Sequence, residues 1–461
     1  MAVTTKKKVV RALVNSLPMA LKRYVLELLT TDLHPGVAQG ADGERVNILL
    51  TQSIDASDTG NYTAAEQALE DAIIIAPNDP RLPPYLSRVR FLRDRANNPD
   101  ALAETEKMLA TLAAMDAEIG KKAIYVPGEF WETWGSFNVR ILKEYGVENF
   151  KRTVSHNYQN WMMIGKDDPQ VRRLQELWPS HRSHQPWLNA MEAPSHVGTP
   201  NGFQSDNHEY PLADLQQREV YRVAVGQLWE YVLSTDTSGI VDGLTELELG
   251  NPLRIWRNGS LISSDVAHSI KERNLLLKNL ELNGQENLTV AELGAGHGRL
   301  AEIFGRTTNY RHVIFDITPA LYVSQWYIKR AFPSERIFEF RPFNSFAEIE
   351  EELRECRFAF FTPNQIEQFP DDAFDLFINM NSLMEMRIDQ IHNFLSHISR
   401  LTRRAFLSRQ WFKRHYDEDK QSVEKKDFVL DNRWKIILDE IDDIYPDFFI
   451  QIWSKESDSI S

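Results

Sequence analysis

The last third of the chain alternates between short apolar runs and stretches with helical spacing. Residues 288–293 form an apolar run, glycines take three of the next five positions, and a helical pattern begins at Arg299. A second apolar run at 312–316 ends in an acid, and further runs lie at 358–361, 374–380 and 405–408. Such alternation is typical of a parallel sheet with helices on both faces. It predicts an α/β fold, a Rossmann-like doubly wound and mostly parallel sheet, over residues 285–461.

The sequence before this segment predicts a mainly helical N-terminal region. Residues 61–76 have apolar residues at helical spacing and end in Pro-Asn-Asp-Pro, like half a tetratricopeptide repeat, and an alanine-rich helix is expected at 100–119. Because one repeat cannot bury its own apolar face, an ordinary helical hairpin is the preferred interpretation. Glycines at 36, 40, 43 and 60 predict a loosely structured connection over residues 32–60. We expect a helical arm at 1–118 and a mainly helical cap region at 119–284.

Composition narrows the class of protein. The 461 residues allow two or three domains, and 42% hydrophobic with 26% charged residues is typical of a globular protein. A net charge of -14 argues against a general nucleic-acid binder, which needs a surplus of Lys and Arg. The single cysteine, Cys356, excludes an internal disulfide and a thiolate metal cluster. A cytoplasmic setting is therefore expected.

The first segment, residues 6–29, mixes lysines with apolar residues in the manner of a secretory signal. Arg11, Asn15 and Pro18 interrupt the apolar part and no small-residue cleavage site follows, so export is not expected. One interpretation is a basic amphipathic helix that makes weak contact with a membrane surface or a protein partner. A surface helix with a charged face is the preferred one.

Two further stretches stand out by composition. Aromatic residues are dense between Tyr125 and Trp187, where a core role is more common than a ligand platform, although aromatic rings also bind the apolar faces of sugars. Residues 179–210 are rich in Pro, Ser, Asn and His and predict a solvated loop or a lid. No metal site is expected there, because the spacing matches no zinc pattern. The side chains in this segment that could in principle bind a metal are His181, His184, His196, Asp206, His208 and Glu209.

The glycine turn at 294–298 carries the main chemical prediction. Glycines let a backbone turn sharply and approach a ligand, and the helix that follows offers unpaired N–H groups to a phosphate or a carboxylate. A dinucleotide fingerprint needs a third glycine at position 299, where Arg299 stands, so the pattern disfavours NAD. Glu292 suits a ligand with an ammonium group. Asp316, 24 residues further on, suits the two hydroxyls of a ribose.

These residues resemble a known group of enzymes. E-x-G-x-G-x-G at 292–298 is similar to motif I of class I S-adenosylmethionine-dependent methyltransferases, and Asp316 is similar to their ribose-binding acid. Residues 369–375 resemble the stretch that leads into their fourth strand, and Pro363-Asn364 then falls at the adenine edge. The resemblance implies S-adenosyl-L-methionine as cofactor. It implies these cofactor-binding residues: Glu292, Gly294, Ala295, Gly296, Gly298, Asp316, Ile317, Asn364, Asn379 and Asn381.

A narrower resemblance concerns the acceptor. Residues 130–132, 148–153, 157–161, 250–252 and 382–386 together resemble the sugar O-methyltransferase family, over roughly residues 120–450. The resemblance implies an O-methyltransferase whose acceptor is a hydroxyl of a sugar, a nucleotide sugar or a glycan, with the cap region binding that acceptor.

Methyl transfer to oxygen is an in-line displacement, and it needs a base close to the methyl group. The candidates are Glu385, His297 and His156. A histidine has a suitable pKa without perturbation, whereas a glutamate needs an upward pKa shift by burial. Each also has a purely structural interpretation: Glu385 in a cap or ion pair, His297 near the cofactor carboxylate, and His156 in the core. The sequence leaves the choice open.

Two other functions remain open at this stage. One is a non-catalytic interaction protein on a methyltransferase fold, against which the intact Glu292, glycine and Asp316 set argues. The other is an NAD(P)-dependent oxidoreductase, which Arg299 disfavours. No oligomeric state is predicted.

Overall fold

The structure is a computed structural model that describes residues 37–79, 81–153, 169–177, 204–205, 215–252, 254–416 and 421–455. The chain divides into two compact units, Met1–Ala103 with His208–Ala213, and Glu104–Asn207 with Asp214–Ser461. The division falls within helix α6 (Pro99–Ile119), and the boundaries of 118 and 284 that the sequence indicates stay predictions. Among the described residues, no helix is long and apolar enough to cross a membrane.

The described part of the first unit contains three complete helices, which share one small core, and the start of α6. They are α3 (Gly40–Asp58), α4 (Tyr62–Ile75) and α5 (Leu82–Ala96). The Asn61 side chain caps α4 by accepting a hydrogen bond from the Ala64 N–H at 3.2 Å. The helix predicted at 61–76 and its stop are confirmed. The core residues are Val46, Leu50, Ala65, Leu69, Ala72, Leu82 and Val89.

The loose connection predicted for residues 32–60 is wrong where the structure describes that stretch. Helix α3 fills most of it, and the glycines Gly40 and Gly60 lie at or just beyond its two ends rather than inside it. Val46 and Leu50, one helical turn apart, are buried against α4 and stabilise the helix by packing. Burial of one helical face outweighed the local preference of the glycines.

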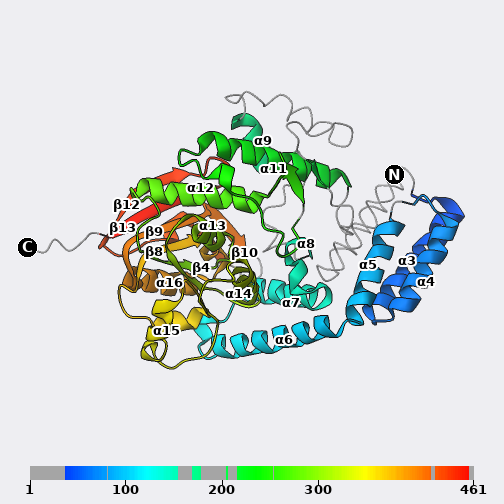
Figure 1. Ribbon diagram of the computed structural model, residues 1–461, viewed down its shortest axis with the longest axis horizontal. Coiled ribbons are helices and arrows are strands. Elements are labelled where there is room, and N and C mark those ends of the chain that lie inside the picture. Colours follow the sequence, from blue (N-terminus) through cyan, green and yellow to red (C-terminus); the bar gives the residue numbers. More distant parts are fainter. Residues whose placement is uncertain are drawn as a thin grey trace, which may run out of the picture. The chain divides into compact units, whose positions relative to one another are not determined.

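The second unit is built on an eight-stranded sheet (Figure 1). The pairs β4–β5, β4–β8, β5–β7, β7–β6 and β8–β9 are parallel, and only β9–β13 and β13–β12 are antiparallel. The doubly wound, mostly parallel sheet is confirmed. In spatial order the strands are β12 (Trp434–Ile441), β13 (Phe448–Lys455), β9 (Thr402–Trp411), β8 (Phe374–Met380), β4 (Thr289–Leu293), β5 (Arg311–Phe315), β7 (Phe358–Phe361) and β6 (Ile337–Phe338).

Helices cover both faces of this sheet. On one face, Leu276 of α12 (Ser264–Asn279) and Phe304 of α13 (Arg299–Thr307) pack against Val290 and Leu376. On the other face, Phe394 of α16 (Ile388–Leu401) joins a core of phenylalanines from β5, β7, β8 and β9. The central strands are buried on both faces, which explains their continuous apolar runs. The remaining helices after β5 are α14 (Ala320–Ala331) and α15 (Glu350–Glu355).

The region before the sheet is mainly helical, as predicted. Its described helices are α7 (Glu129–Tyr145), α8 (Phe150–Thr153), α9 (Pro169–Leu177) and α11 (Leu215–Thr235), and α11 packs beside α12 (Figure 1). A small antiparallel sheet of β1 (Gln204–Ser205), β2 (Ile255–Arg257) and β3 (Ser260–Ile262) accompanies them. A separate hairpin, β10 (Lys413–Tyr416) with β11 (Gln421–Glu424), follows β9.

Candidate active site

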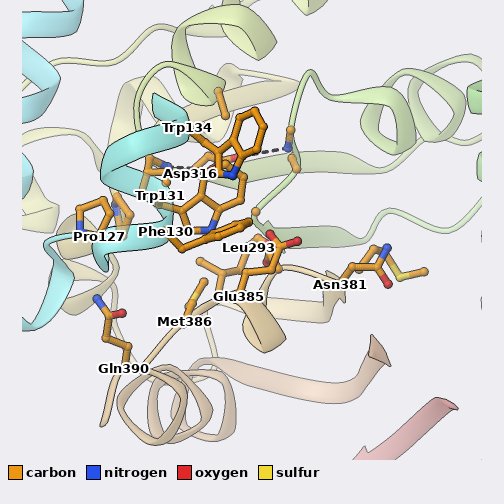
Figure 2. A pocket seen from close by; sticks show the side chains of 18 of the residues that line it. Pro127, Phe130, Trp131, Trp134, Leu293, Asp316, Asn381, Glu385, Met386 and Gln390 are labelled. Carbon is orange, nitrogen blue, oxygen red and sulfur yellow. Dashed lines mark hydrogen bonds between the residues drawn. The ribbon is translucent and has the colours of Figure 1, made fainter. Parts of the chain in front are cut away.

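A cavity of about 280 Å³ lies at the carboxyl ends of β4, β5 and β8. The chain winds outward from β4 in both directions, to β5 and β7 on one side and to β8 and β9 on the other. In open α/β sheets the crevice at such a switch point is where ligands bind. Glu292, Asp316 and Glu385 all line this one cavity (Figure 2).

The glycine turn forms the floor of the cavity between β4 and α13. Gly294, Gly296 and Gly298 all have positive φ angles, of 72°, 60° and 85°. A Cβ on Gly294 would lie 2.1 Å from Ser382 Oγ, so any side chain there would force Ser382 to move. The Ser382 hydroxyl in turn donates to the Leu293 carbonyl at 3.1 Å. Close contact between the ends of β4 and β8 therefore fixes the backbone path of the turn.

Asp316 ties the end of β5 to the glycine turn. Its two carboxylate oxygens accept hydrogen bonds from the Gly296 N–H at 2.9 Å and the Ile317 N–H at 2.7 Å. Burial raises the pKa of Asp316 to about 7, although these two backbone bonds lower it, and the negative charges of Glu292 and Glu385 add to the rise. Asp316 is therefore a buried acceptor whose charge changes near neutral pH.

Glu292 lies at the end of β4 with one carboxylate oxygen fixed. Its Oε2 is 2.8 Å from the Nε2 of His312, and both side chains are almost fully buried, with 3% and 1% of their surface exposed. Glu292 still reaches the cavity wall. Two acids, at the ends of neighbouring strands β4 and β5, thus face one cavity on either side of the glycine turn.

Glu385 closes the opposite side of the cavity from the short 3-10 helix η8 (Leu383–Glu385) after β8. Burial raises its pKa to about 7, and the positive charge of Arg414 opposes that rise. The Arg414 Nη1 lies 3.5 Å from Glu385 Oε1, and its guanidinium stacks over the rings of Trp411 and Phe130 at 4.5 and 5.3 Å. Glu385 is therefore a carboxyl group that can take up a proton near pH 7.

His297 also lines the cavity, but its ring is enclosed by protein. It lies between the rings of Phe150 and Tyr327, at centroid distances of 5.3 and 5.4 Å. Its Nε2 is 3.8 Å from Asp265 Oδ2 of α12, too far for a hydrogen bond. Burial, reinforced by Lys151 and Arg299, holds the pKa of His297 well below its ordinary value. The ring is neutral at physiological pH.

Aromatic side chains from α7 form the wall above the strand ends. Phe130, Trp131 and Trp134 line the cavity, with Phe130 in edge contact with Trp131 at 5.3 Å. Figure 2 shows these rings projecting from α7 toward Asp316 and Glu385. The start of α7 is held in place because the Gln390 amide of α16 donates to the carbonyls of Ile124 and Val126, each at 2.9 Å.

The other sequence-predicted residues divide into two groups. Ala295, Ile317 and Asn381 line the cavity. Gly298, Asn364 and Asn379 are not among its lining residues. Asn379 is bonded to the Leu293 carbonyl, Ser382, Leu383 and Gln410, and Asn364 donates to Glu118 of α6 at 3.1 Å. His156 lies outside the described residues, as do the histidines and acids of the 179–210 loop.

Among known proteins, this chain is similar only to solved structures. No protein-family model matches the chain, and no curated protein matches it. The similar structures include magnesium protoporphyrin IX methyltransferase from Synechocystis PCC 6803 with bound SAM, at 13% identity and a TM-score of 0.28, over 42% of this chain and 82% of that one. Another is 1,6-didemethyltoxoflavin-N1-methyltransferase from Burkholderia thailandensis. Its sequence identity is 13% and its TM-score is 0.28, over 42% of this chain and 79% of that one.

A 4+2 cyclase is also similar, at 14% identity and a TM-score of 0.29, over 41% of this chain and 81% of that one. These TM-scores are low, so the likenesses carry no argument about function.

Three residues that act on this site were not predicted as site residues from the sequence. Trp411 reaches the cavity from the end of β9 and Arg414 from β10, and His312 lies one strand away from the acid that it contacts. No motif marks Arg414 or Trp411. A histidine within the apolar run 312–316 was visible in the sequence, and a polar residue on a buried strand needs a partner.

Proposed function

We propose that the protein is an S-adenosylmethionine-dependent O-methyltransferase that acts on a hydroxyl group of a sugar or glycan. One observation carries the proposal. Glu292, the glycine turn and Asp316 line the same cavity as Glu385 and the aromatic rings of α7. A donor with an amino-acid end and a nucleoside end and an acceptor with a hydroxyl group would thus meet in one enclosure.

The residues present fit this cofactor by their chemistry. Glu292 offers an acceptor for its ammonium group, Asp316 offers one for its ribose hydroxyls, and the glycine turn lets the backbone come close to both. When bound, the cofactor supplies an electrophilic methyl group on a sulfonium. Arg299 stands where a dinucleotide fingerprint needs its third glycine, and its side chain is held by Glu272 at 2.6 and 3.0 Å.

Glu385 is the base in this proposal. The Glu385 carboxylate would accept the proton of the acceptor hydroxyl, whose oxygen would take the methyl group that the bound cofactor supplies, and the cofactor would leave as its neutral thioether. A pKa of about 7 makes this carboxylate a much stronger base than an exposed glutamate. His297 is less suitable because its ring is packed between Phe150 and Tyr327. We assign His297 to shaping the glycine turn.

The acceptor side favours a ligand with both apolar and polar faces. The rings of Phe130, Trp131 and Trp134 suit the C–H face of a saccharide, and Glu385 and Arg414 suit its hydroxyl groups. A cytoplasmic location would fit nucleotide-sugar acceptors and stays part of the proposal.

A labelled-methyl transfer assay tests the proposal, with a panel of nucleotide sugars, lipid-linked saccharides and polysaccharides. Label should appear on a saccharide with the full chain and not with Glu292→Ala or Asp316→Ala. Transfer to none of the saccharides, but to a small aromatic or a protein, would contradict the sugar assignment and keep methyl transfer. Binding of NADH in preference to S-adenosylhomocysteine would contradict both.

A further inference from the structure

A buried histidine contacts Glu292 from outside the cavity. His312 is the second residue of β5, and in the parallel pairing of β4 with β5 it lies opposite Val290, two residues before Glu292. Both side chains therefore project from the same face of the sheet, toward α13, where the His312 ring lies 5.8 Å from the Phe304 ring. His312 is not among the residues that line the cavity.

The contact orients the Glu292 carboxylate. The His312 Nε2 lies 2.8 Å from Oε2, and among the described residues no other hydrogen bond to this carboxylate is found. One oxygen is thus directed into the sheet face, and the other remains for a ligand in the cavity. An acid with free rotation would have to lose that freedom whenever a ligand binds.

The tautomer of His312 follows from its surroundings. Its Nδ1 is buried and has no hydrogen-bond partner among the described residues. A buried N–H without a partner is rarer than a buried lone pair without one. The ring therefore carries its hydrogen on Nε2 and donates it to Glu292.

We propose that His312 is a positioning residue for the amino-acid end of the cofactor: it holds Glu292 so that the free carboxylate oxygen receives the ammonium group. The proposal rests on the proposed function. It assigns to this histidine an effect on one end of the ligand and none on the other, because His312 reaches the cavity only through Glu292.

Two ligands can distinguish effects on the amino-acid end of the cofactor from effects on its nucleoside end. S-Adenosylhomocysteine has the amino-acid end, and 5′-methylthioadenosine keeps the nucleoside and sulfur but lacks it. In calorimetric titrations of the full chain, His312→Leu and His312→Asn should weaken S-adenosylhomocysteine about tenfold, since each removes a hydrogen bond to a charged group. Both should leave 5′-methylthioadenosine unchanged within about twofold. His312→Gln can place an amide N–H near the position of Nε2 and should restore most of the affinity.

A double-mutant cycle tests whether His312 affects S-adenosylhomocysteine affinity through Glu292. In a Glu292→Gln background, His312→Asn should cost S-adenosylhomocysteine little further affinity. Thermal unfolding confirms that each variant is folded, and the milder Asn variant decides the matter if the Leu variant unfolds.

Equal losses for both ligands, or additive losses in the cycle, would overturn the proposal, because His312 would then be a core residue only. If the unmodified chain binds 5′-methylthioadenosine and S-adenosylhomocysteine but His312 variants bind both normally, the proposed function stands and the inference fails. If the unmodified chain binds neither ligand, the proposed function itself fails and this inference fails with it.

Discussion

The two halves of the cavity are built in different ways. The half with Glu292, the glycine turn and Asp316 comes from two adjacent strands and one turn, within 25 residues of sequence. Backbone N–H groups hold Asp316, the His312 ring holds Glu292, and Ser382 packs closely on Gly294. The half with Glu385 comes from η8, α7, β9 and β10, and its contacts are ring edges and one Arg–Glu pair. The first half fixes a backbone shape, whereas the second presents side chains.

The difference indicates where specificity resides. A shape made from backbone and buried acids tolerates few substitutions, which suits a ligand that does not vary. A wall made from side chains can be exchanged residue by residue, which suits an acceptor that differs between related enzymes. Substitutions in the first half should therefore change cofactor affinity, and substitutions in the second half should change acceptor use.

Glu385→Gln should have the largest effect. It removes the proposed base, so methyl transfer should fall by about 10²- to 10⁴-fold while S-adenosylhomocysteine affinity stays within about twofold. The same variant should unfold at a higher temperature at pH 8 but not at pH 4.5. The pKa of Glu385 is raised to about 7, so its ionised form destabilises the fold increasingly above its ordinary pKa of 4.5. Full activity in the Gln variant would remove Glu385 from the chemistry.

Gly294→Ala should be next, and it should act on the cofactor half alone. A Cβ would collide with Ser382, and a φ of 72° is strained for alanine, so S-adenosylhomocysteine affinity should fall about 30-fold, equal to ~2 kcal/mol. Calorimetry measures it. Gly259→Ala is the matched control, since Gly259 has a φ of 82° with nothing within 4 Å and lies outside the cavity. Equal losses in both variants would mean that strain in general, rather than this turn, matters.

The pH dependence of methyl transfer should depend on one acid from each half of the cavity, Asp316 and Glu385. Because burial raises the pKa values of Asp316 and Glu385 to about 7, both carboxylates become ionised as the pH rises through 7. Ionised Glu385 accepts the proton and ionised Asp316 binds ribose hydroxyls. At saturating cofactor the transfer rate should rise about tenfold between pH 6 and pH 8 through Glu385 alone, and at low cofactor concentration about 100-fold through both groups. A rate that falls over this range would contradict the assignment of Glu385 as a base.

Trp131→Ala should have the smallest effect and should act on the acceptor half. Loss of one ring from the wall should raise the acceptor KM about fivefold and leave S-adenosylhomocysteine affinity unchanged. Phe137→Ala is the matched control, because Phe137 lies on the same helix but does not line the cavity. If Phe137→Ala raised KM equally, the effect would come from a loosened α7.

The sequence predicted the central strands and the cofactor half of the cavity better than the acceptor half. The runs at 288–293, 312–316, 358–361 and 374–380 match β4, β5, β7 and β8 closely, because strands buried on both faces are apolar throughout. The glycine turn was recognisable because its residues are neighbours in sequence. In contrast, β12 was not predicted, because most of it is exposed and its residues follow no apolar alternation. The sequence analysis also missed β13, although its first six residues are buried.

The acceptor half of the cavity could not be predicted from the sequence, because its residues are far apart along the chain. Arg414 meets Glu385 across 29 residues and Phe130 across nearly three hundred, and such contacts depend on the tertiary fold. Glu385 itself was named, but only the enclosure around it raises its pKa to about 7. The sequence left three candidate bases open. His156 lies outside the described residues, and of the other two the packing favours Glu385 over the enclosed His297.

The most direct test of the account is a calorimetric titration of S-adenosylhomocysteine into the full chain and into Glu292→Ala and Asp316→Ala. We expect one molecule bound per chain, with affinity lowered at least tenfold by each substitution while both variants keep the thermal unfolding of the original. If the folded chain gives no binding heat, or if both variants bind as tightly as the original, the two acids do not hold the ends of a common ligand and the account is wrong.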